Sequence, residues 1–318
     1  PRRGWHLSGM FDAMERGDLT AVYCIGENPV QSEADQKRAI HLLRSLDFLV
    51  VQDLFLTKTA ELADVVLPAT AAWAESDGTV TNSERRVQRV RAAVAPPPGA
   101  RDDLAIIFEL ANRMGAGWGE PDPETVWNEV RRLSPVHAGM SYRRLEELGG
   151  LQWPCYDEEH PGELYLHSRL WEDPVPGHRV PFVPVEHDPP VDRLTKDFPV
   201  RLTTGRRLDS YNTGVQTGGY TSPLRRGESL DISPEDAEAL GLTDGELVRV
   251  VSRRGQVEVP IRIDASLRPG LTFMTLHFQD DVATNLLTID ATDPKSGTAE
   301  FKATAIRIEK LAAAVAAG

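Results

Sequence analysis

The sequence has few cysteines, no long apolar run and a deficit of basic charge. Its 318 residues include only two cysteines, Cys24 and Cys155, which are too few for a disulfide framework or a cysteine-ligated cluster. No stretch approaches the run of about 18 apolar residues that a membrane-spanning helix needs. The formal net charge of −13 opposes binding to nucleic acid and to anionic lipid. We therefore expect a cytoplasmic protein with no nucleic-acid partner.

Two kinds of ligand motif are missing as well. The chain has no G-x-G-x-x-G and no G-x-x-x-x-G-K-[ST], so it carries neither an ordinary NAD fingerprint nor a P-loop. Its eight histidines are scattered and form no H-E-x-x-H, which argues against a metal ion held by protein side chains. We assign no catalytic residue and no metal ligand to this chain.

Three short apolar runs lie close together near the start of the chain. They are AVYCIG, DFLVVQD and ADVVLPA, at residues 21 to 26, 47 to 53 and 63 to 69. Such runs are typical of strands buried on both faces of a parallel sheet. Ser32 can cap a helix between the first two runs, with Ile40, Leu43 and Leu46 on one face. The pattern predicts β-α-β packing, either as a plain structural unit or as the frame of a ligand site.

A basic segment and a further helix follow. The segment SERRVQRVR, residues 83 to 91, fits a solvated face or the wall of a ligand cleft better than a nucleic-acid site in so acidic a chain. Residues 103 to 114 have helical spacing, with Ile106, Leu110 and Met114 on one face. We expect an α/β domain over residues 1 to 120.

The remaining chain divides into a connector and a strand-rich end. Residues 121 to 196 are rich in proline but too apolar for a disordered linker, so they predict an ordered connector. Over residues 197 to 318 alternating β-branched residues predict strands, and Gly255 marks a hairpin turn. Ser233 can cap one short helix that ends at Gly241. We expect a small β-barrel with helical insertions.

Two polar segments are candidates for ligand binding. Gly26 and Asn28 follow the first apolar run, where a glycine turn before a helix suits a phosphate group, and Asp53 ends the second run. The loop LTTGRRLDSYNTGVQTGG, residues 202 to 219, offers hydroxyls, amides and two arginines. A phosphate-rich ligand would suit this loop, and an ordinary glycine-rich surface loop is the plain alternative.

Several long motifs together resemble the C-terminal half of molybdopterin-dependent oxidoreductases of the dimethyl sulfoxide reductase family. They are YCIGENPVQSEAD, LDFLVVQDLFLTKTAELADVVLPAT, DGTVTNSERRVQRV, LTTGR, YNTG, ISPEDAEALGLTDGELVRVVSRRG and TNLLTIDATDPKSGTAEFKATAIRIE. Within that family, LQWPC, HPGELYLH and PVEHDPP most resemble the catalytic subunit of metal-dependent formate dehydrogenase. The resemblance implies a partial Rossmann-like parallel α/β domain, followed by a double-psi β-barrel-like domain that binds a molybdopterin dinucleotide.

The resemblance also implies a cofactor, bis-molybdopterin guanine dinucleotide with Mo or W. One dinucleotide would contact Gly26, Glu27, Asn28, Gln52, Asp53, Thr57 and Asp103. The other would contact Thr203, Thr204, Gly205, Arg206, Arg207, Asn212, Thr213, His277, Asn285 and Lys302. Asp103 would recognise guanine, because a carboxylate accepts from the two adjacent donors of that base.

The implied activity belongs to a larger assembly. The family's iron–sulfur cysteine motif and its cysteine or selenocysteine metal ligand have no counterpart in this chain, which begins with Pro1 and reads as a fragment or processed piece. The 4Fe-4S clusters would lie in the absent N-terminal half, and an iron–sulfur or flavin subunit would carry electrons away. The intact enzyme would oxidise formate to CO₂ or reduce CO₂, whereas this chain alone would be inactive. The alternatives are another molybdenum enzyme, such as assimilatory nitrate reductase, and a non-catalytic respiratory-complex scaffold of the same fold.

Overall fold

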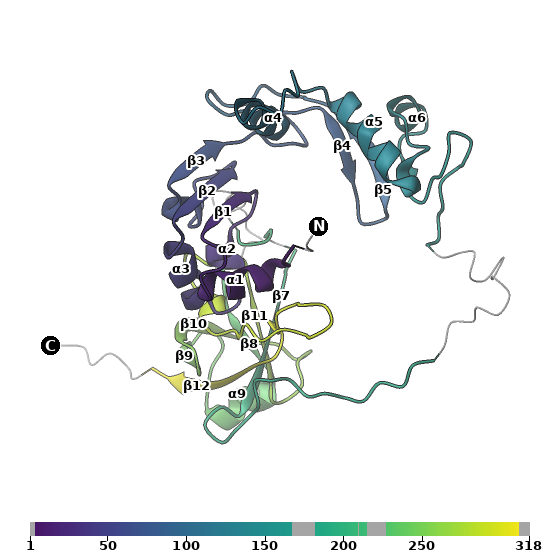
Figure 1. Cartoon of the computed structure of the whole chain (residues 1–318). Coiled ribbons are helices and arrows are strands. Elements are labelled where there is room, and N and C mark those ends of the chain that lie inside the picture. The colour runs from purple at the N-terminus through teal and green to yellow at the C-terminus, as the bar shows by residue number, and fades with distance from the viewer. Residues whose placement is uncertain (1–3, 167–181, 209, 215–226, 312–318) are drawn as a thin grey trace. The chain divides into compact units, whose positions relative to one another are not determined.

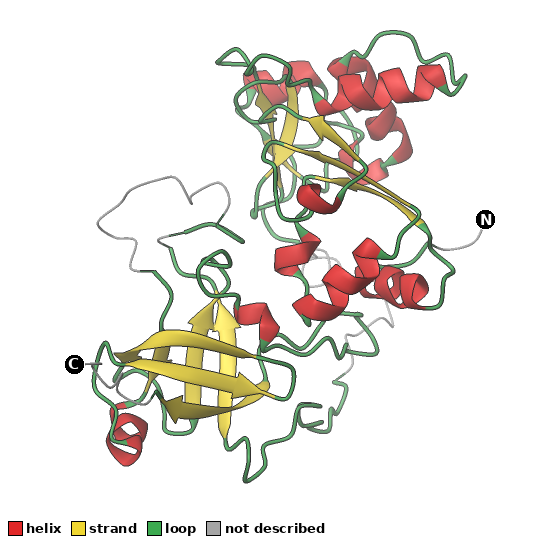
Figure 2. Ribbon diagram, turned by 90° about the vertical axis from the view of Figure 1, so that its left-hand side faces the viewer, coloured by secondary structure: helices red, strands yellow, loops and turns green. Residues whose placement is uncertain are grey.

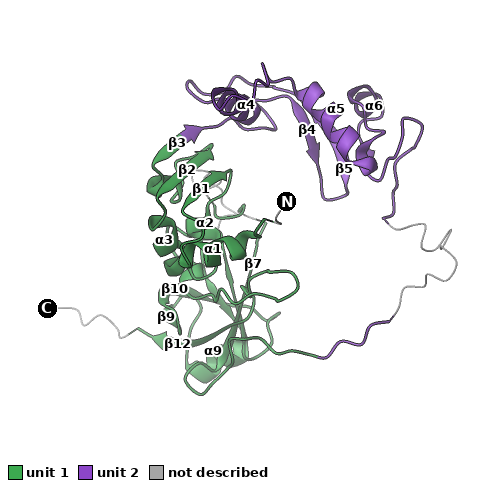
Figure 3. Cartoon of the chain, in the orientation of Figure 1, with its two compact units in different colours: residues 1–66, 187–318 green, residues 67–186 purple. Residues whose placement is uncertain are grey.

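The computed structural model describes residues 4–166, 182–208, 210–214 and 227–311 (Figure 1). Helices and short strands share the chain up to residue 152, whereas strands dominate from residue 200 onward (Figure 2). Contacts divide the chain into two compact units, one of residues 1–66 with 187–318 and one of residues 67–186 (Figure 3). The start of the chain and the strand-rich end therefore belong to one unit.

The first unit opens with a small sheet made from the three predicted apolar runs. Strand β1 (Ala21–Ile25) pairs in parallel with β2 (Phe48–Asp53), and β3 (Val65–Pro68) is the other neighbour of β2. The expected burial on both faces is wrong for the outer strands, since Tyr23 and Ile25 of β1 and both valines of β3 are exposed. The sheet is thus buried mainly through β2.

Three helices cover this sheet. They are α1 (Leu7–Glu15), α2 (Pro29–Ser32) and α3 (Gln36–Arg44). The predicted cap at Ser32 is wrong, because Asp35 caps α3 by accepting from the Arg38 N–H, and Ser32 instead ends the separate turn α2. Apolar side chains of the three helices form a common core with Phe11, Val30 and Leu42 at its centre.

The rest of the unit is a closed barrel in the order β10-β8-β11-β7-β12-β9 (Figure 2). Its strands are β7 (Val200–Gly205), β8 (Leu230–Ile232), β9 (Leu247–Ser252), β10 (Gln256–Ile263), β11 (Leu271–Thr275) and β12 (Thr304–Lys310). The predicted helix is α9 (Pro234–Leu240), capped by Ser233 and ended by Gly241 as expected. The predicted hairpin turn at Gly255 joins β9 to β10. Inward-facing Leu, Ile, Val and Met side chains fill the barrel, and most of them have no exposed surface.

Strand pairing brings several segment ends to one end of this barrel. Thr275, the last residue of β11, lies opposite Gly205, the last residue of β7. Strand β12 runs the other way and begins with Thr304 opposite Leu202. Asp231 near the start of β8 pairs with β11, so the segment before β8 meets the same end. We call residues 203–208, 210–214, 227–229, 275–288 and 300–303 the barrel mouth.

The second unit is a three-stranded sheet with helices. Its strands are β4 (Gly78–Thr81), β5 (Arg86–Val90) and β6 (Leu151–Gln152). Its helices are α4 (Asp103–Arg113), α5 (Pro123–Leu133) and α6 (Tyr142–Glu147), and the 3₁₀ turn η2 (Pro135–His137) lies between α5 and α6. Two further 3₁₀ turns, η1 (Ala60–Leu62) and η3 (Thr284–Leu286), belong to the first unit. Residues 86–90 of the basic segment form β5, where Arg89 stacks on the Tyr142 ring. The predicted apolar face of α4 is only partly buried, since Leu110 and Met114 are exposed.

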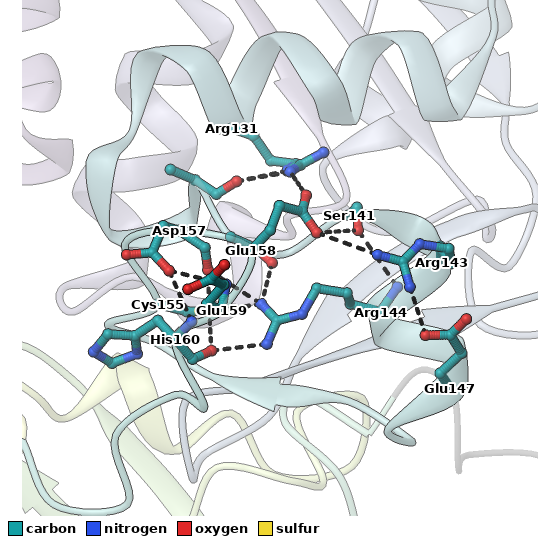
Figure 4. Close-up of polar contacts among 12 residues, drawn as sticks. Arg131, Ser141, Arg143, Arg144, Glu147, Cys155, Asp157, Glu158, Glu159 and His160 are labelled. Atoms are coloured by element: carbon teal, nitrogen blue, oxygen red, sulfur yellow. Dashed lines mark hydrogen bonds and ion pairs between the residues drawn. The ribbon is translucent and has the colours of Figure 1, made fainter.

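A buried arginine organises the connector part of this unit (Figure 4). The Arg144 guanidinium donates to the carbonyl oxygens of Gly139, Asp157 and His160, at 2.5, 3.2 and 2.8 Å. It also lies 3.4 Å from the Cys155 thiol, which is fully buried. Because carbonyl partners satisfy both groups, this cluster holds the loop in place and gives Cys155 a structural environment.

Candidate functional site

The centre of the barrel mouth is a contact between β7 and the segment that leads into β12. The Lys302 ammonium donates to the Thr204 carbonyl oxygen at 2.8 Å, and the Thr204 hydroxyl donates to the Phe301 carbonyl oxygen at 2.9 Å. These residues are almost 100 positions apart in the sequence, and the barrel closure brings them together. Two residues predicted for one ligand therefore touch each other.

His277 holds the polar loop that crosses the mouth. Its Nε2 accepts from the Arg207 backbone N–H at 2.8 Å, and its Nδ1 lies 2.7 Å from the Asn212 carbonyl oxygen. An acceptor at Nε2 and a carbonyl at Nδ1 require the neutral imidazole with its proton on Nδ1. The ring is buried, with 1% of its surface exposed. His277 therefore positions this loop, and both of its ring nitrogens are engaged by protein.

The backbone of the same loop is closely fitted to His277. Asn212 has a φ of 43°, in the left-handed region, and Gly214 has a φ of 85°. A Cβ atom at Gly214 would lie 1.9 Å from the His277 carbonyl oxygen. Only glycine fits there, so YNTG has a local steric reason in addition to any ligand.

Glu228 is a buried carboxyl at the mouth that the sequence did not single out. It accepts from the Thr275 N–H at 3.0 Å, from the Thr275 hydroxyl and from the Ser229 N–H. Burial raises the pKa of Glu228, and these hydrogen bonds and the nearby Arg207 offset that rise in part. Glu235 and Asp236 of the same acidic segment lie in the first turn of α9, where acids stabilise a helix N-terminus, whereas Glu228 lies before β8. In the sequence, the one signal that could have singled out Glu228 is its position just before strand β8, which begins at the mouth.

The remaining predicted residues of the mouth differ in exposure. Arg206 and Lys302 are exposed cations, and Thr203 and Thr213 are half-buried. Gly205 packs against the Phe273 ring, which a Cβ atom would approach to 2.9 Å. The predicted residues of the mouth thus present hydroxyls and two cations to the outside, beside the exposed carboxylates of Asp280 and Asp281. Gly205 has a packing role.

The turn between β1 and α2, residues 26–28, is the second predicted cluster. Gly26 has a φ of 64°, its N–H donates to the Gln52 carbonyl oxygen at 2.8 Å, and the space around a Cβ atom there is open. Glu27 is exposed. Burial, with Glu27 as a second cause, raises the pKa of Glu33 to about 7 and of the Cys24 thiol to about 11. The Cys24 thiol is therefore a poor nucleophile at neutral pH.

Other residues predicted around this turn are occupied by the protein itself. Gln52 is fully buried and accepts from the Tyr23 hydroxyl. Thr57 is buried, and its hydroxyl accepts from the Ala60 N–H at 3.1 Å. Asp53 ends β2 and accepts from the Phe55 N–H at 3.2 Å. Asp103 is the first residue of α4 and belongs to the second unit.

Asn28 and Asn285 are both buried and hydrogen-bonded. The Asn28 side-chain oxygen accepts from the Thr59 hydroxyl at 2.8 Å, and its nitrogen donates to the Gln31 side chain at 2.7 Å. The Asn285 nitrogen donates to the carbonyl oxygens of Gln31 and Ser32, at 3.1 and 3.2 Å. These amides join parts of the first unit to each other.

The described residues hold no cluster of three or more His, Cys, Asp or Glu side chains suited to a metal ion. Nor does any helix within them have the length and apolar character to cross a membrane. The side chains of the two clusters carry hydroxyls, amides, carboxylates and cations.

Comparisons with known proteins identify the chain's family. The family model described as molydopterin dinucleotide binding domain matches residues 200–305, which include most of the barrel and its mouth. The model described as molybdopterin oxidoreductase matches residues 4–113. The chain belongs to the molybdopterin oxidoreductases.

Curated relatives of this molybdopterin oxidoreductase chain include formate dehydrogenases and nitrate reductases. The F420-dependent formate dehydrogenase subunit alpha of Methanocaldococcus jannaschii is 40% identical over 98% of this chain and 46% of its own length. The assimilatory nitrate reductase catalytic subunit of Bacillus subtilis is 35% identical over 97% of this chain and 44% of its own. This chain spans about half the length of these relatives.

A solved structure supports the fold. Acetylene hydratase from Pelobacter acetylenicus matches 95% of this chain and 46% of its own chain, with a TM-score of 0.68 and 21% sequence identity. At that identity the likeness concerns the fold alone. The mixed α/β architecture with a closed six-stranded barrel agrees with the fold of the molybdopterin oxidoreductases.

Proposed function

We propose that this chain is the C-terminal cofactor-binding portion of a formate dehydrogenase catalytic subunit. The observation that carries the proposal is the barrel mouth, where exposed Arg206 and Lys302 lie among hydroxyls within a stretch matched by a dinucleotide-binding family model. Relatives named formate dehydrogenase are 40 and 44% identical to the chain. Its double-psi barrel topology and the predicted boundaries 1–120, 121–196 and 197–318 are part of the same proposal.

The ligand proposed for the chain is bis-molybdopterin guanine dinucleotide with Mo or W. The donor set of the mouth fits one dinucleotide, because cations and hydroxyls are the natural partners of a diphosphate. The residues that would hold it are Thr203, Thr204, Arg206, Arg207, Asn212, Thr213 and Lys302. When bound, the cofactor supplies a metal centre that accepts two electrons from formate. The chain's own residues bind and orient it.

The turn at residues 26–28 would hold part of the second dinucleotide. Gly26 has open space on its Cβ side, so a ligand can approach its backbone closely. Asp53 and Asp103 each carry a carboxylate for the ribose hydroxyls or for the donors on guanine. Glu27 lies in the turn itself.

The chain's proposed partners are the N-terminal half of the same subunit, with its 4Fe-4S clusters, and an iron–sulfur or flavin electron-transfer subunit. The exposed apolar side chains Tyr23, Ile25 and Phe48 of the small sheet support a covering polypeptide. A cytoplasmic location completes the proposal.

Assimilatory nitrate reductase is the second candidate, because two such enzymes are 35 and 37% identical to this chain. A non-catalytic scaffold is disfavoured, since it would not need exposed Arg206 and Lys302 beside hydroxyls. The test is metal and pterin analysis of the purified intact protein, followed by assays with formate and with nitrate. Mo or W with two guanine dinucleotides and formate oxidation support the proposal. Nitrate reduction alone supports the second candidate, and absence of metal and pterin contradicts both.

A further inference from the structure

A chain of buried polar side chains connects the β1–α2 turn to the barrel. It begins at Thr59, passes through Asn28 to Gln31, and ends where the Gln31 side-chain nitrogen donates to Asp280 Oδ1 at 2.9 Å. Asn28, Gln31 and Thr59 are 8, 3 and 0% exposed. Asp280 follows β11 in the barrel mouth and is itself exposed. The connection between Gln31 and Asp280 therefore joins residues 249 positions apart.

A second bond runs in the opposite direction, from the barrel to the helix. The buried Asn285 nitrogen donates to two carbonyl oxygens at the end of α2, those of Gln31 and Ser32. Its side-chain oxygen accepts from the Thr288 hydroxyl at 3.3 Å. The last carbonyls of a helix have no partner within it, so Asn285 supplies one from outside.

Two charged contacts also join α3 to segments of the barrel. Arg38 of α3 pairs with Asp290 at 2.9 Å, and the Lys37 ammonium donates to the Arg254 carbonyl oxygen at 3.0 Å. All of these bonds lie within the first unit. The helices that follow residues 26–28 are thus attached to the mouth by polar bonds and to other barrel segments by charged contacts.

We propose that Asn28, Gln31, Asp280 and Asn285 form a clamp that sets the spacing between the two loops expected to hold the dinucleotides. They are positioning residues, because each directs its hydrogen-bonding groups to the others or to neighbouring protein groups. The functional significance of this spacing rests on the proposed function, whereas the clamp itself is supported by the hydrogen-bond distances. The clamp then acts on the ligand through the placement of the loops that carry Asn28 and Asn285.

The Gln31–Asp280 bond permits an exchange of donor and acceptor. Gln31→Glu alone places two carboxylates against each other, and Asp280→Asn alone removes the acceptor. The double variant restores a donor facing an acceptor with the original charge, and the carboxylate introduced at position 31 can still accept from Asn28. Gln256→Glu and Asp281→Asn are matched controls, because they make the same changes at exposed positions.

The test is amide hydrogen exchange on this chain. Gln31→Glu should speed exchange of residues 278–288 by at least about fivefold, the factor that corresponds to one lost hydrogen bond. The double variant should return to within about twofold of the original chain, and the controls should not change. Faster exchange confined to residues 29–33, or a double variant no better than Gln31→Glu, would overturn the clamp.

Metal content of the intact enzyme separates this inference from the proposed function. A direct ligand role predicts that Gln31→Glu lowers metal and pterin content and that the double variant stays low. The clamp predicts recovery in the double variant. If the unmodified intact protein holds no cofactor, the proposed function fails, whereas the exchange experiment still decides the clamp.

Discussion

The barrel and the small parallel sheet bury their apolar residues to very different extents. In the barrel, side chains such as Leu202, Met274 and Ile306 have no exposed surface. In the sheet, Ile25 is 41% and Phe48 47% exposed. A barrel has no free edge and encloses its own core, whereas an open sheet needs cover on each face. The difference shows that the barrel encloses its own core, and it fits the proposal that further polypeptide covers the sheet.

The largest expected effect contrasts two isoleucine truncations. Ile306→Ala leaves a cavity in the barrel core and should lower the free energy of unfolding by about 2 to 5 kcal/mol. Ile25→Ala in β1 removes a side chain that is already half exposed, so it should cost less than about 1 kcal/mol. Urea unfolding of each variant measures both costs. Hydrogen exchange of the barrel amides then reports the loss of stability within the barrel. Equal losses of unfolding free energy for the two variants would contradict the difference in burial between the barrel and the sheet.

The next effect tests how the connector closes the barrel. Asp192 is buried, pairs with Arg253 and Arg254, and accepts from the Ala305 N–H at 2.9 Å. Asp192→Asn removes the charge from these bonds and should cost about 1.5 to 3 kcal/mol. Asp188→Asn, at an exposed position, is the control. The urea midpoint of the barrel reports the effect, and matching midpoints for the two variants would show that Asp192 is dispensable.

On the sheet side, Glu33 predicts a pH dependence. Its pKa is about 7 in the folded chain, against an ordinary 4.5, so between these values the folded state binds more protons than the unfolded state. The unfolding free energy therefore falls as the pH rises through that window. Glu33→Gln should stabilise the chain at pH 8 by on the order of 1 to 2 kcal/mol and change little at pH 4.

Thermal or urea unfolding at the two pH values checks this expectation. Glu238→Gln, on an exposed face of α9, serves as the control and should show no difference between them. If the difference in unfolding free energy between Glu33→Gln and the original chain is the same at pH 4 and pH 8, Glu33 is well solvated.

The smallest effect concerns the loop at the mouth. His277→Asn keeps a donor for the Asn212 carbonyl, and His277→Gln keeps an acceptor for the Arg207 N–H. Each should lose about one hydrogen bond, or ~1 kcal/mol of local stability. The rate of amide hydrogen exchange at Arg207 should therefore rise about fivefold in the Asn variant. In the Gln variant the rate at Arg207 should stay below that of the Asn variant. His41→Asn, on the exposed face of α3, controls for loss of an imidazole.

The sequence predicted the elements better than their surroundings. Local patterns sufficed for the three apolar runs, for α9 between Ser233 and Gly241, and for the barrel, because caps, turns and alternation act over a few residues. Asp35 rather than Ser32 caps α3, because the chain makes a separate turn first.

The site was predictable as a set of segments but not in its individual contacts. LTTGR, the residues before β12 and those after β11 meet at one end, since barrel closure brings strand ends together. The partners of His277, Asn285 and Glu228 lie far away in the sequence, so no local pattern reveals them. The roles of the predicted ligand-binding residues remain a prediction.

The most direct test is a structure of the intact enzyme prepared without oxygen. We expect two guanine dinucleotides, with one diphosphate between Arg206 and Lys302 and with His277 still bonded to the backbone at Arg207 and Asn212. A mouth filled by protein side chains, or a dinucleotide bound elsewhere, would contradict it.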